Sequence, residues 1–112
     1  MLRRNGRRVA VVSGYFDPLL AEHAERLEEI RRGSDALLVL VRQPPQPILP
    51  TRARAELVAG LSAVDYVVAP EDGEILDQTA LATAIHEEDA DIRRLAALAG
   101  LVRRRQSAGE RP

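Results

Sequence analysis

The chain has 112 residues, which is enough for one hydrophobic core but not for two, so we expect a single domain over residues 1–112. Hydrophobic residues make up 46% of it and charged residues 29%, and the net charge of −1 gives no case for a nucleic-acid partner. The lack of cysteine excludes disulfides and thiolate metal sites, and no apolar run is long enough to cross a membrane. All 16 basic residues are arginine, so a site that requires a lysine amine is also excluded.

The N-terminal segment is basic before it turns apolar. Its arginines resemble the start of a signal peptide, but the apolar run over residues 9–12 is only four residues long, which is too short for one. We therefore expect the protein in the cytoplasm. Residues 9–13 are rich in β-branched side chains and predict a strand that ends at Gly14, followed by a turn over residues 14–18.

Residues 22–32 predict the first helix. Leu27 and Ile30 fall on one face of it, and Gly33 is a natural helix stop. The run over residues 36–41 contains six aliphatic residues in succession. That length favours a buried strand over a helix.

A proline-rich loop and a second helix follow. Residues 43–50 contain four prolines, so we expect an extended loop. Thr51 can cap a helix over residues 52–62. The apolar stripe of this helix consists of Leu57, Val58 and Leu61. Residues 65–69 then predict a third strand, and residues 71–73 a turn.

The next segment allows two interpretations. Residues 75–81 could form a short helix that leads into a fourth strand over residues 82–86, or one helix could run over residues 76–87. Residues 90–105 clearly predict a final helix, and residues 107–112 a polar tail that we expect to be frayed. One face of the final helix carries Ile92, Leu95, Ala99 and Val102. The acidic residues around its start, Glu87, Glu88, Asp89 and Asp91, favour a negatively charged helix N-terminus over a metal site.

Strands that alternate with helices predict a parallel sheet built from βαβ units. Right-handed crossovers then give three or four strands in the order 3-2-1-4, with helices on both faces. Ligands of such sheets bind at the carboxyl ends of the strands, beside the switch in strand order, so we expect residues 13–23 to line the site. The positions that we expect to be buried are Val9, Val11, Leu27, Ile30, Leu38, Leu40, Leu57, Leu61, Val64, Val67, Leu95 and Val102.

The ten residues from Gly14 to His23 carry the clearest functional signal. They read Gly-Tyr-Phe-Asp-Pro-Leu-Leu-Ala-Glu-His and resemble the Gly-x-Phe-Asp-x-x-His-x-Gly-His signature of the cytidylyltransferase-like nucleotidylyltransferases. Residues 54–68 are similar to that family's Arg-x-x-x-Leu-x-x-Leu-x-x-Val-Asp-x-Val-Val stretch. The resemblance covers residues 8–69.

This resemblance implies a Rossmann-like α/β domain, a three-layer sandwich. It also implies a transferase that moves a nucleotidyl group from a nucleoside triphosphate, with Mg²⁺, to a small phosphorylated acceptor and releases pyrophosphate. His23 is implied as the catalytic residue, and no residue as a metal ligand. The implied nucleotide-binding residues are Gly14, Tyr15, Phe16, Asp17, His23 and Arg54. The expected partner is a nucleotide or a phosphorylated small molecule, not a nucleic acid or a membrane, and a homodimer stays open.

The sequence departs from the family pattern at four points. Leu20 stands where the first signature histidine is expected, and Glu22 stands where the glycine is expected. The family's lysine is missing, and nothing resembles its C-terminal Ile-Ser-Ser/Thr-x-x-x-Arg motif. Because only interactions that strengthen in the transition state raise the rate, we expect weak or absent turnover.

The site residues also have purely structural interpretations. His23 can cap its helix, Asp17 can cap the turn and Arg54 can be a solvated helix charge. Three functions therefore remain open. The chain is a nucleotidyltransferase or nucleotide binder with a reduced site, or it is a pseudoenzyme, a non-catalytic descendant that serves as an interaction or regulatory module. The third alternative is an unrelated α/β domain that matches by chance.

Overall fold

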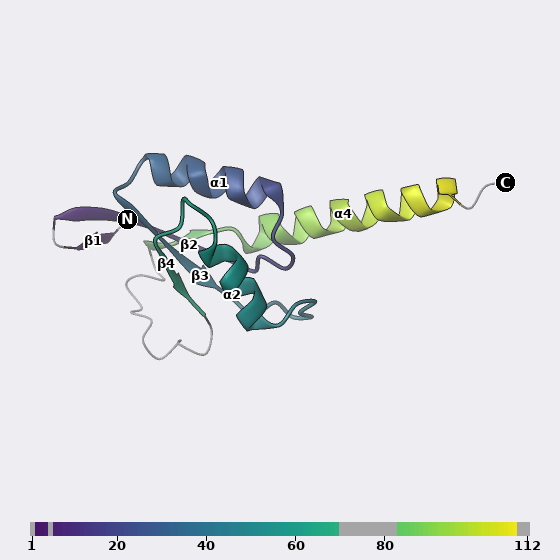
Figure 1. The fold of residues 1–112 in the computed structure, drawn as a ribbon, viewed down its shortest axis with the longest axis horizontal. Coiled ribbons are helices and arrows are strands. Elements are labelled where there is room, and N and C mark those ends of the chain that lie inside the picture. Colours follow the sequence, from purple (N-terminus) through teal and green to yellow (C-terminus); the bar gives the residue numbers. More distant parts are fainter. Residues whose placement is uncertain (1, 5, 70–82, 110–112) are drawn as a thin grey trace.

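The computed structural model describes residues 2–4, 6–69 and 83–109, with side chains over 6–69 and 83–101. The strands form one sheet (Figure 1). Strands β2 (Arg7–Gly14), β3 (Ala36–Val41), β4 (Tyr66–Val68) and β5 (Ile85–His86) are parallel, and β1 (Leu2–Arg4) pairs antiparallel with β2.

The parallel part of the sheet has the order β4-β3-β2-β5. One row across it pairs Ile85 with Val12, Val12 with Val39, and Val39 with Val67. In terms of the strands expected from the sequence this order is 3-2-1-4, so the predicted α/β class and strand order are confirmed. The crossover rule supplied the order, because each βαβ connection returns on a fixed side of the sheet.

Strand β5 decides between the two interpretations of its segment. It occupies Ile85–His86, so a single helix over residues 76–87 is wrong. The predicted strand over residues 82–86 is confirmed for its last two residues. The expected turn at 71–73 and the short helix at 75–81 lie outside the described residues.

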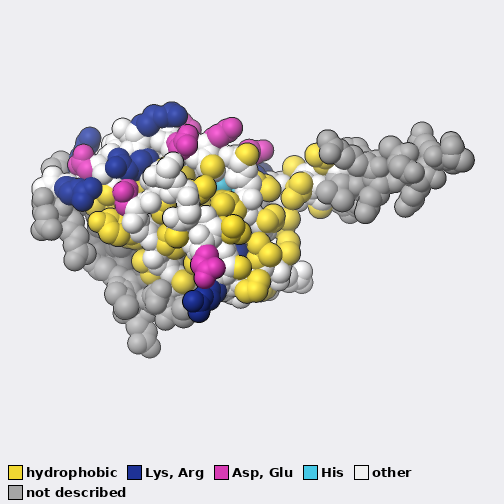
Figure 2. Space-filling model, viewed as in Figure 1, with side chains coloured by type: hydrophobic (Ala, Val, Ile, Leu, Met, Phe, Trp, Pro, Cys, Tyr) yellow, Lys and Arg dark blue, Asp and Glu magenta, His cyan; other side chains and the backbone are white. Residues whose placement is uncertain are grey.

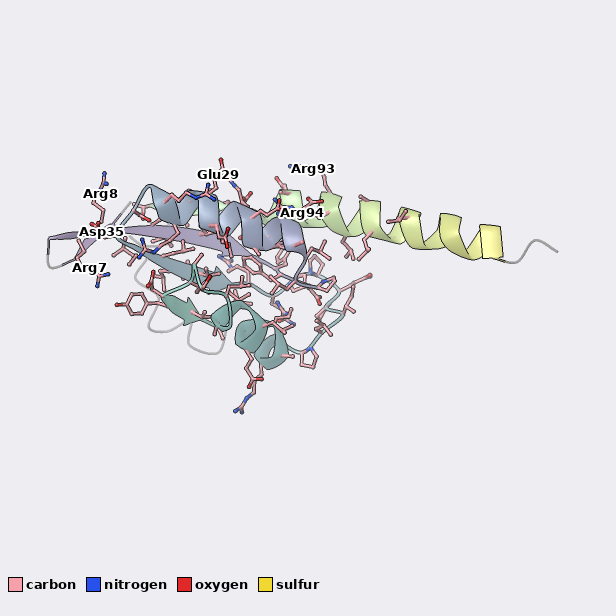
Figure 3. All side chains as sticks on the ribbon, turned by 45° about the horizontal axis from the view of Figure 1, so that its top comes forward. Arg7, Arg8, Glu29, Asp35, Arg93 and Arg94 are labelled. Carbon is pink, nitrogen blue, oxygen red and sulfur yellow. The ribbon has the colours of Figure 1, made fainter. Side chains whose placement is uncertain are left out.

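The hairpin of β1 and β2 was not predicted. Its register places Arg3 opposite Arg8 and Arg4 opposite Arg7. In Figure 3 the side chains of Arg7 and Arg8 point to opposite sides of the hairpin. Asp35 fixes the β2 strand of this hairpin. The Arg8 N–H donates to Asp35 Oδ2 at 2.7 Å, and Arg7 Nη2 donates to the Asp35 carbonyl at 3.2 Å.

Three described helices complete the fold: α1 (Ala21–Arg32), α2 (Thr51–Ala59) and α4 (Glu88–Gly109). Helices α1 and α2 pack against β3. Helix α4 starts beside α1, and its later turns project away from the body of the molecule (Figure 1). At about 1.5 Å per residue its 22 residues span about 33 Å. No described helix is both long enough and apolar enough to cross a bilayer.

The helix ends differ in detail from the predictions. Pro50, not Thr51, is the N-cap of α2, and Thr51 Oγ1 donates to Gln43 Oε1 at 2.8 Å instead of capping the helix. Helix α2 ends at Ala59, three residues earlier than predicted. Helix α4 includes residues 107–109 of the expected polar tail, and residues 110–112 lie outside the described part.

The core lies between β2, β3 and the helices α1 and α2. Its buried side chains are Ala10, Val12, Phe16, Leu27, Leu37, Val39, Val41 and Val58. Of the predicted core positions, Val11, Leu27 and Leu40 are buried. Seven are only half-buried: Val9, Ile30, Leu38, Leu61, Val64, Val67 and Leu95. The Val102 side chain lies outside the description.

Leu57 is a wrong prediction, because it is 50% exposed. Helix α2 turns Arg54 and Val58 toward the body of the protein, and both are buried. Figure 2 shows hydrophobic side chains gathered on the surface over α2 and the loop before it. Ile48, at 60% exposure, belongs to this loop.

Candidate functional site

His23 lies in the first turn of α1, as predicted, and it is buried. The backbone N–H of Leu20 donates to His23 Nδ1 at 2.9 Å. His23 thus takes the position that Glu or Gln usually has in a capping box, where its side chain accepts the N–H of the N-cap residue. Because a backbone N–H can only donate, Nδ1 is the acceptor and Nε2 carries the ring proton. His23 therefore caps its helix through Nδ1, as the structural interpretation proposed. Its Nε2 proton is left to make a second contact.

The second contact is with Asp91, a carboxylate in the first turn of α4. His23 Nε2 donates to Asp91 Oδ1 at 2.5 Å, across 68 residues of sequence. The N–H of Tyr15 donates to Asp91 Oδ2 at 2.7 Å, and that of Phe16 at 3.4 Å. Arg94 Nη1 adds a contact to Oδ1 at 3.0 Å. We call these four donors, on Tyr15, Phe16, His23 and Arg94, the anion cradle.

The backbone after β2 shapes the anion cradle. Phe16 has φ of 51°, in the left-handed region, which is uncommon for a residue with a side chain. Such a turn can aim successive N–H groups at one anion, as in backbone nests. Gly14 provides the space. A Cβ at this position would lie 2.8 Å from Asp91 Oδ2 and 2.9 Å from the Phe16 ring.

The cradle changes the ionisation of Asp91. Burial raises the pKa of the carboxyl, but the hydrogen bonds from His23 and from the N–H groups of Tyr15 and Phe16 outweigh burial. The net pKa lies below its ordinary value, so the carboxylate is held in its charged form. Arg94, 15% exposed, provides the opposite charge.

Asp17 lies at the edge of the site but not in the anion cradle. Its two carboxylate oxygens accept the N–H groups of Ile48, at 2.6 Å, and Leu49, at 2.8 Å. It therefore ties the turn after β2 to the proline-rich loop. This position is compatible with a turn-forming role for Asp17 more than with direct contact to a phosphate.

Arg54 is fully buried, so the prediction of a solvated helix charge is wrong. Its Nη1 donates to the carbonyls of Tyr15 and Arg42, at 2.9 and 2.8 Å. The remaining N–H groups donate to the Leu49 carbonyl, Gln43 Oε1 and Thr51 Oγ1. With its donors satisfied by protein atoms, Arg54 acts as a brace that joins the turn after β2 to α2 and the loop between them.

A cavity of about 280 Å³ opens beside the anion cradle. His23 and Asp91 form part of its lining, together with Tyr15 and Asp17. Apolar walls come from Pro18, Leu20, Pro44, Pro45, Ile92 and Leu95. The cavity lies next to the carboxyl end of β2, where the strand order predicts a ligand site. Gly14, Tyr15, Phe16 and His23 are thus brought together here, and Arg54 only supports them.

Two residues of this site were not found from the sequence. The sequence pattern indicates a helix-terminal charge at Asp91 and predicts no role for Arg94. The available signal was their spacing of three residues, which places a carboxylate and a guanidinium on one helix face. Figure 3 shows Arg93 pointing away from the body, whereas Arg94 lies toward α1, with its Nε 3.4 Å from Glu22 Oε2. Glu22 is thus paired with Arg94.

The chain is similar in sequence to part of several curated proteins. No family model matches it. The bifunctional protein HldE of Chromohalobacter salexigens is 40% identical over 72 residues, which is 56% of this chain and 15% of that protein. HldE of Acidiphilium cryptum is 34% identical over 84 residues, which is 67% of this chain and 17% of that protein. The chain thus spans only about a sixth of the length of these curated relatives.

A solved structure shares the fold. The crystal structure of the lipopolysaccharide core biosynthesis protein from Thermoplasma volcanium superposes with a TM-score of 0.57 at 25% identity. The match covers 70% of this chain and 69% of that one. Three findings indicate the same superfamily: the sheet order, the sequence from Gly14 to His23, and the similarity to these relatives. The chain belongs to the nucleotidyltransferase superfamily.

Proposed function

We propose that this domain binds a nucleotide, or another small phosphorylated molecule, at the anion cradle and turns it over slowly or not at all. The observation that supports the proposal is the convergence of two backbone N–H groups, an imidazole N–H and a guanidinium on one anion. The donors of Tyr15, Phe16 and His23 belong to the Gly14–His23 motif, and the guanidinium comes from Arg94 on α4.

A phosphate suits these donors for the same reason that a carboxylate does. Both present charged oxygens that accept short hydrogen bonds from N–H groups. Phosphate has more acceptor oxygens and a larger charge at neutral pH. The apolar side chains of Leu20, Ile92 and Leu95 line the neighbouring cavity and offer contacts to the less polar part of a ligand.

We expect a metal ion to arrive with the ligand and not to occupy a site made by the described residues. Among the residues that the structure describes, no group of three or more His, Cys, Asp or Glu side chains could hold one. Both oxygens of Asp17 accept backbone N–H groups, and both oxygens of Asp91 are in the cradle. Mg²⁺ would therefore be held mainly by the oxygens of a triphosphate, which is its usual manner of binding.

Turnover should be poor because donors for the transition state are missing. Leu20 donates nothing to a phosphoryl group, and Glu22 is negative. Loss of one preorganised donor costs about 2.7–4 kcal/mol of transition-state stabilisation in other enzymes. Transfer to a small phosphorylated acceptor with pyrophosphate release should therefore be far below the ordinary enzymatic range of about 1–10³ s⁻¹. We place this binding function in the cytoplasm, where nucleoside triphosphates are available.

Thermal unfolding of the full chain with nucleoside triphosphates and Mg²⁺ tests the proposal, alongside an assay of pyrophosphate release. A ligand present at 100 times its Kd should add about 2.7 kcal/mol to the free energy of unfolding. His23→Asn should abolish the gain, because Asn removes the Nε2 donor. His86→Asn, in the other histidine of the chain, is the matched control and should keep it. A wild-type protein that responds to no nucleotide contradicts the binding proposal, and an ordinary rate of release contradicts poor turnover.

A second candidate function is a non-catalytic interaction or regulatory module. The observation in its favour is that the cradle is already satisfied by a residue of the same chain. Among the described residues, no buried side-chain nitrogen or oxygen lacks a hydrogen-bond partner. Insensitivity to every nucleotide in the unfolding experiment would favour this candidate.

A further inference from the structure

We propose that Asp91 is a built-in competitor of the phosphate ligand, so that the domain exchanges between a closed state and an open one. In the closed state the Asp91 carboxylate occupies the anion cradle. In the open state a phosphate takes the place of the carboxylate at the donors of Tyr15, Phe16 and His23, and the first turn of α4 has moved away. This inference rests on the proposed function, and it adds the regulation of the same site.

The two anions exclude each other because they need the same donors. His23 has a single ring N–H, since Nδ1 accepts from Leu20, and this N–H is bound to Asp91. The N–H groups of Tyr15 and Phe16 also point at Asp91 Oδ2. The space above Gly14 is taken as well, because even a Cβ there would lie 2.8 Å from that oxygen. A phosphate can reach the cradle only when Asp91 leaves.

The size of the cavity agrees with a closed state. Its volume of about 280 Å³ lies just under the range of about 300–1,000 Å³ that is usual for small-molecule sites. Asp91, Ile92 and Leu95 of α4 form one side of it. Movement of this turn would therefore free the donors and enlarge the cavity at the same time.

Apart from the bonds of Asp91 itself, the described contacts at the start of α4 include two charge pairs and one backbone hydrogen bond, from the Glu87 N–H to the Ser13 carbonyl at 2.8 Å. Arg26 Nε contacts Glu87 Oε1 at 2.7 Å just before α4, and Arg94 contacts Glu22, whose side chain is 72% exposed. Because one partner of each pair is exposed, Arg26 at 38% and Glu22, solvent weakens both pairs, and exposed pairs stabilise by only about 0–1 kcal/mol. The apolar side chains at the start of α4 are only partly anchored, because Ile92 is 51% exposed and Leu95 is half-buried. Much of the helix beyond projects away from the body (Figure 1). The start of α4 is thus the part that can move.

Competition predicts the direction of a mutational effect. A ligand that binds only the open fraction has its apparent affinity reduced by that fraction. Asp91→Ala removes the competing carboxylate, so the apparent affinity is no longer reduced by a closed state. This variant should bind inorganic pyrophosphate at least tenfold more tightly than wild type. Asp89→Ala is the matched control, because Asp89 lies in the same helical turn but is exposed, and it should leave the affinity unchanged.

The experiment combines titration calorimetry with inorganic pyrophosphate and amide hydrogen exchange of residues 88–95 in the wild-type full chain. The proposal expects measurable wild-type binding, tighter binding by Asp91→Ala and faster exchange at the start of α4 when pyrophosphate is bound. If Asp91→Ala does not fold, as judged by circular dichroism, Asp91→Asn replaces it, because Asn keeps the shape and loses the charge.

The other outcomes separate this inference from the proposed function. Wild-type binding with no gain in Asp91→Ala and unchanged exchange overturns the competitor and leaves phosphate binding intact. Binding by Asp91→Ala alone shows that the wild-type carboxylate never leaves, which overturns both the exchange and the wild-type binding function. Binding by neither protein overturns both as well.

Discussion

Gly14 and Asp91 are the residues on which the site depends most, because the absence of a side chain at one makes room for the carboxylate of the other. In Gly14→Ala the new Cβ would lie 2.8 Å from Asp91 Oδ2 and 2.9 Å from the Phe16 ring, so one of them must shift. We expect a loss of about 1–3 kcal/mol in the free energy of unfolding, as for other overpacked sites, measured with urea. Gly33→Ala is the control, because the nearest atom to its Cβ is 3.7 Å away. Equal losses in both variants would show that Gly14 has no special role.

The ionisation of Asp91 gives the stability of the fold a pH dependence. Its pKa is lower in the folded protein than in the unfolded chain, where the pKa of an aspartate is about 3.9. The stabilisation is therefore complete above that value and is lost as the pH falls through the lower, folded pKa. The side chains that face the carboxylate are the His23 imidazole, which donates a hydrogen bond, and the Arg94 guanidinium, which is positively charged.

The comparison of wild type with Asp91→Asn isolates this contribution. From about pH 4 downward, the free energy of unfolding should fall more steeply for wild type, by at most about 1.4 kcal/mol per pH unit. Near neutral pH the two slopes should agree. Parallel curves over the whole acid range would mean that the carboxylate has the same pKa in the folded and unfolded chains.

At the scale of elements, the start of α4 is held by charges more than by packing. Arg26→Gln removes the contact between α1 and Glu87, and hydrogen exchange of the amides of residues 88–94 should become several-fold faster. Arg52→Gln removes the exposed pair with Glu56 within α2, and it should leave these amides unchanged. The amides in the middle of β2 and β3 should not respond to either variant. Unchanged exchange at α4 in Arg26→Gln would contradict charge-based docking.

The elements also show how much of the fold was predictable. Strand β3 matches its prediction at both ends, because an uninterrupted aliphatic run bounded by polar residues has few alternatives. The helix α1 is right to within one residue for a similar reason, since Gly33 ends it. The hairpin strand β1 was missed because its three residues Leu2–Arg4 carry no β-strand pattern, and it forms only by pairing with β2. Local sequence does not record such pairings.

The site shows the same division between local and distant information. The segment from Gly14 to His23 is contiguous, so its motif could be recognised. Asp91 comes from 68 residues beyond His23, and a carboxylate near a helix start is normally a solvated charge. Arg54 was assigned to the nucleotide, but its donors are used inside the fold. The residue type therefore predicts what each side chain can bind. Only the tertiary structure shows which partner it binds.

At the scale of the whole molecule, two segments that are distant in the sequence meet at one place. The turn after β2 supplies backbone N–H groups and His23, and the start of α4 supplies Asp91 and Arg94. The fold is shared with the solved relative, and in the proposed function the Asp91 carboxylate stands where a phosphate would bind. The central claim is that the N–H groups of Tyr15 and Phe16 can exchange this carboxylate for a phosphate.

Nuclear magnetic resonance of the ¹⁵N-labelled protein tests that claim most directly, through a titration with inorganic pyrophosphate. We predict that the amide signals of Tyr15 and Phe16 shift most, together with those of the first turn of α4. The amide signals of Arg7 and Arg8, at the far end of β2, should move little. Saturating shifts confined to the arginine-rich hairpin, with Tyr15 and Phe16 unmoved, would contradict the account.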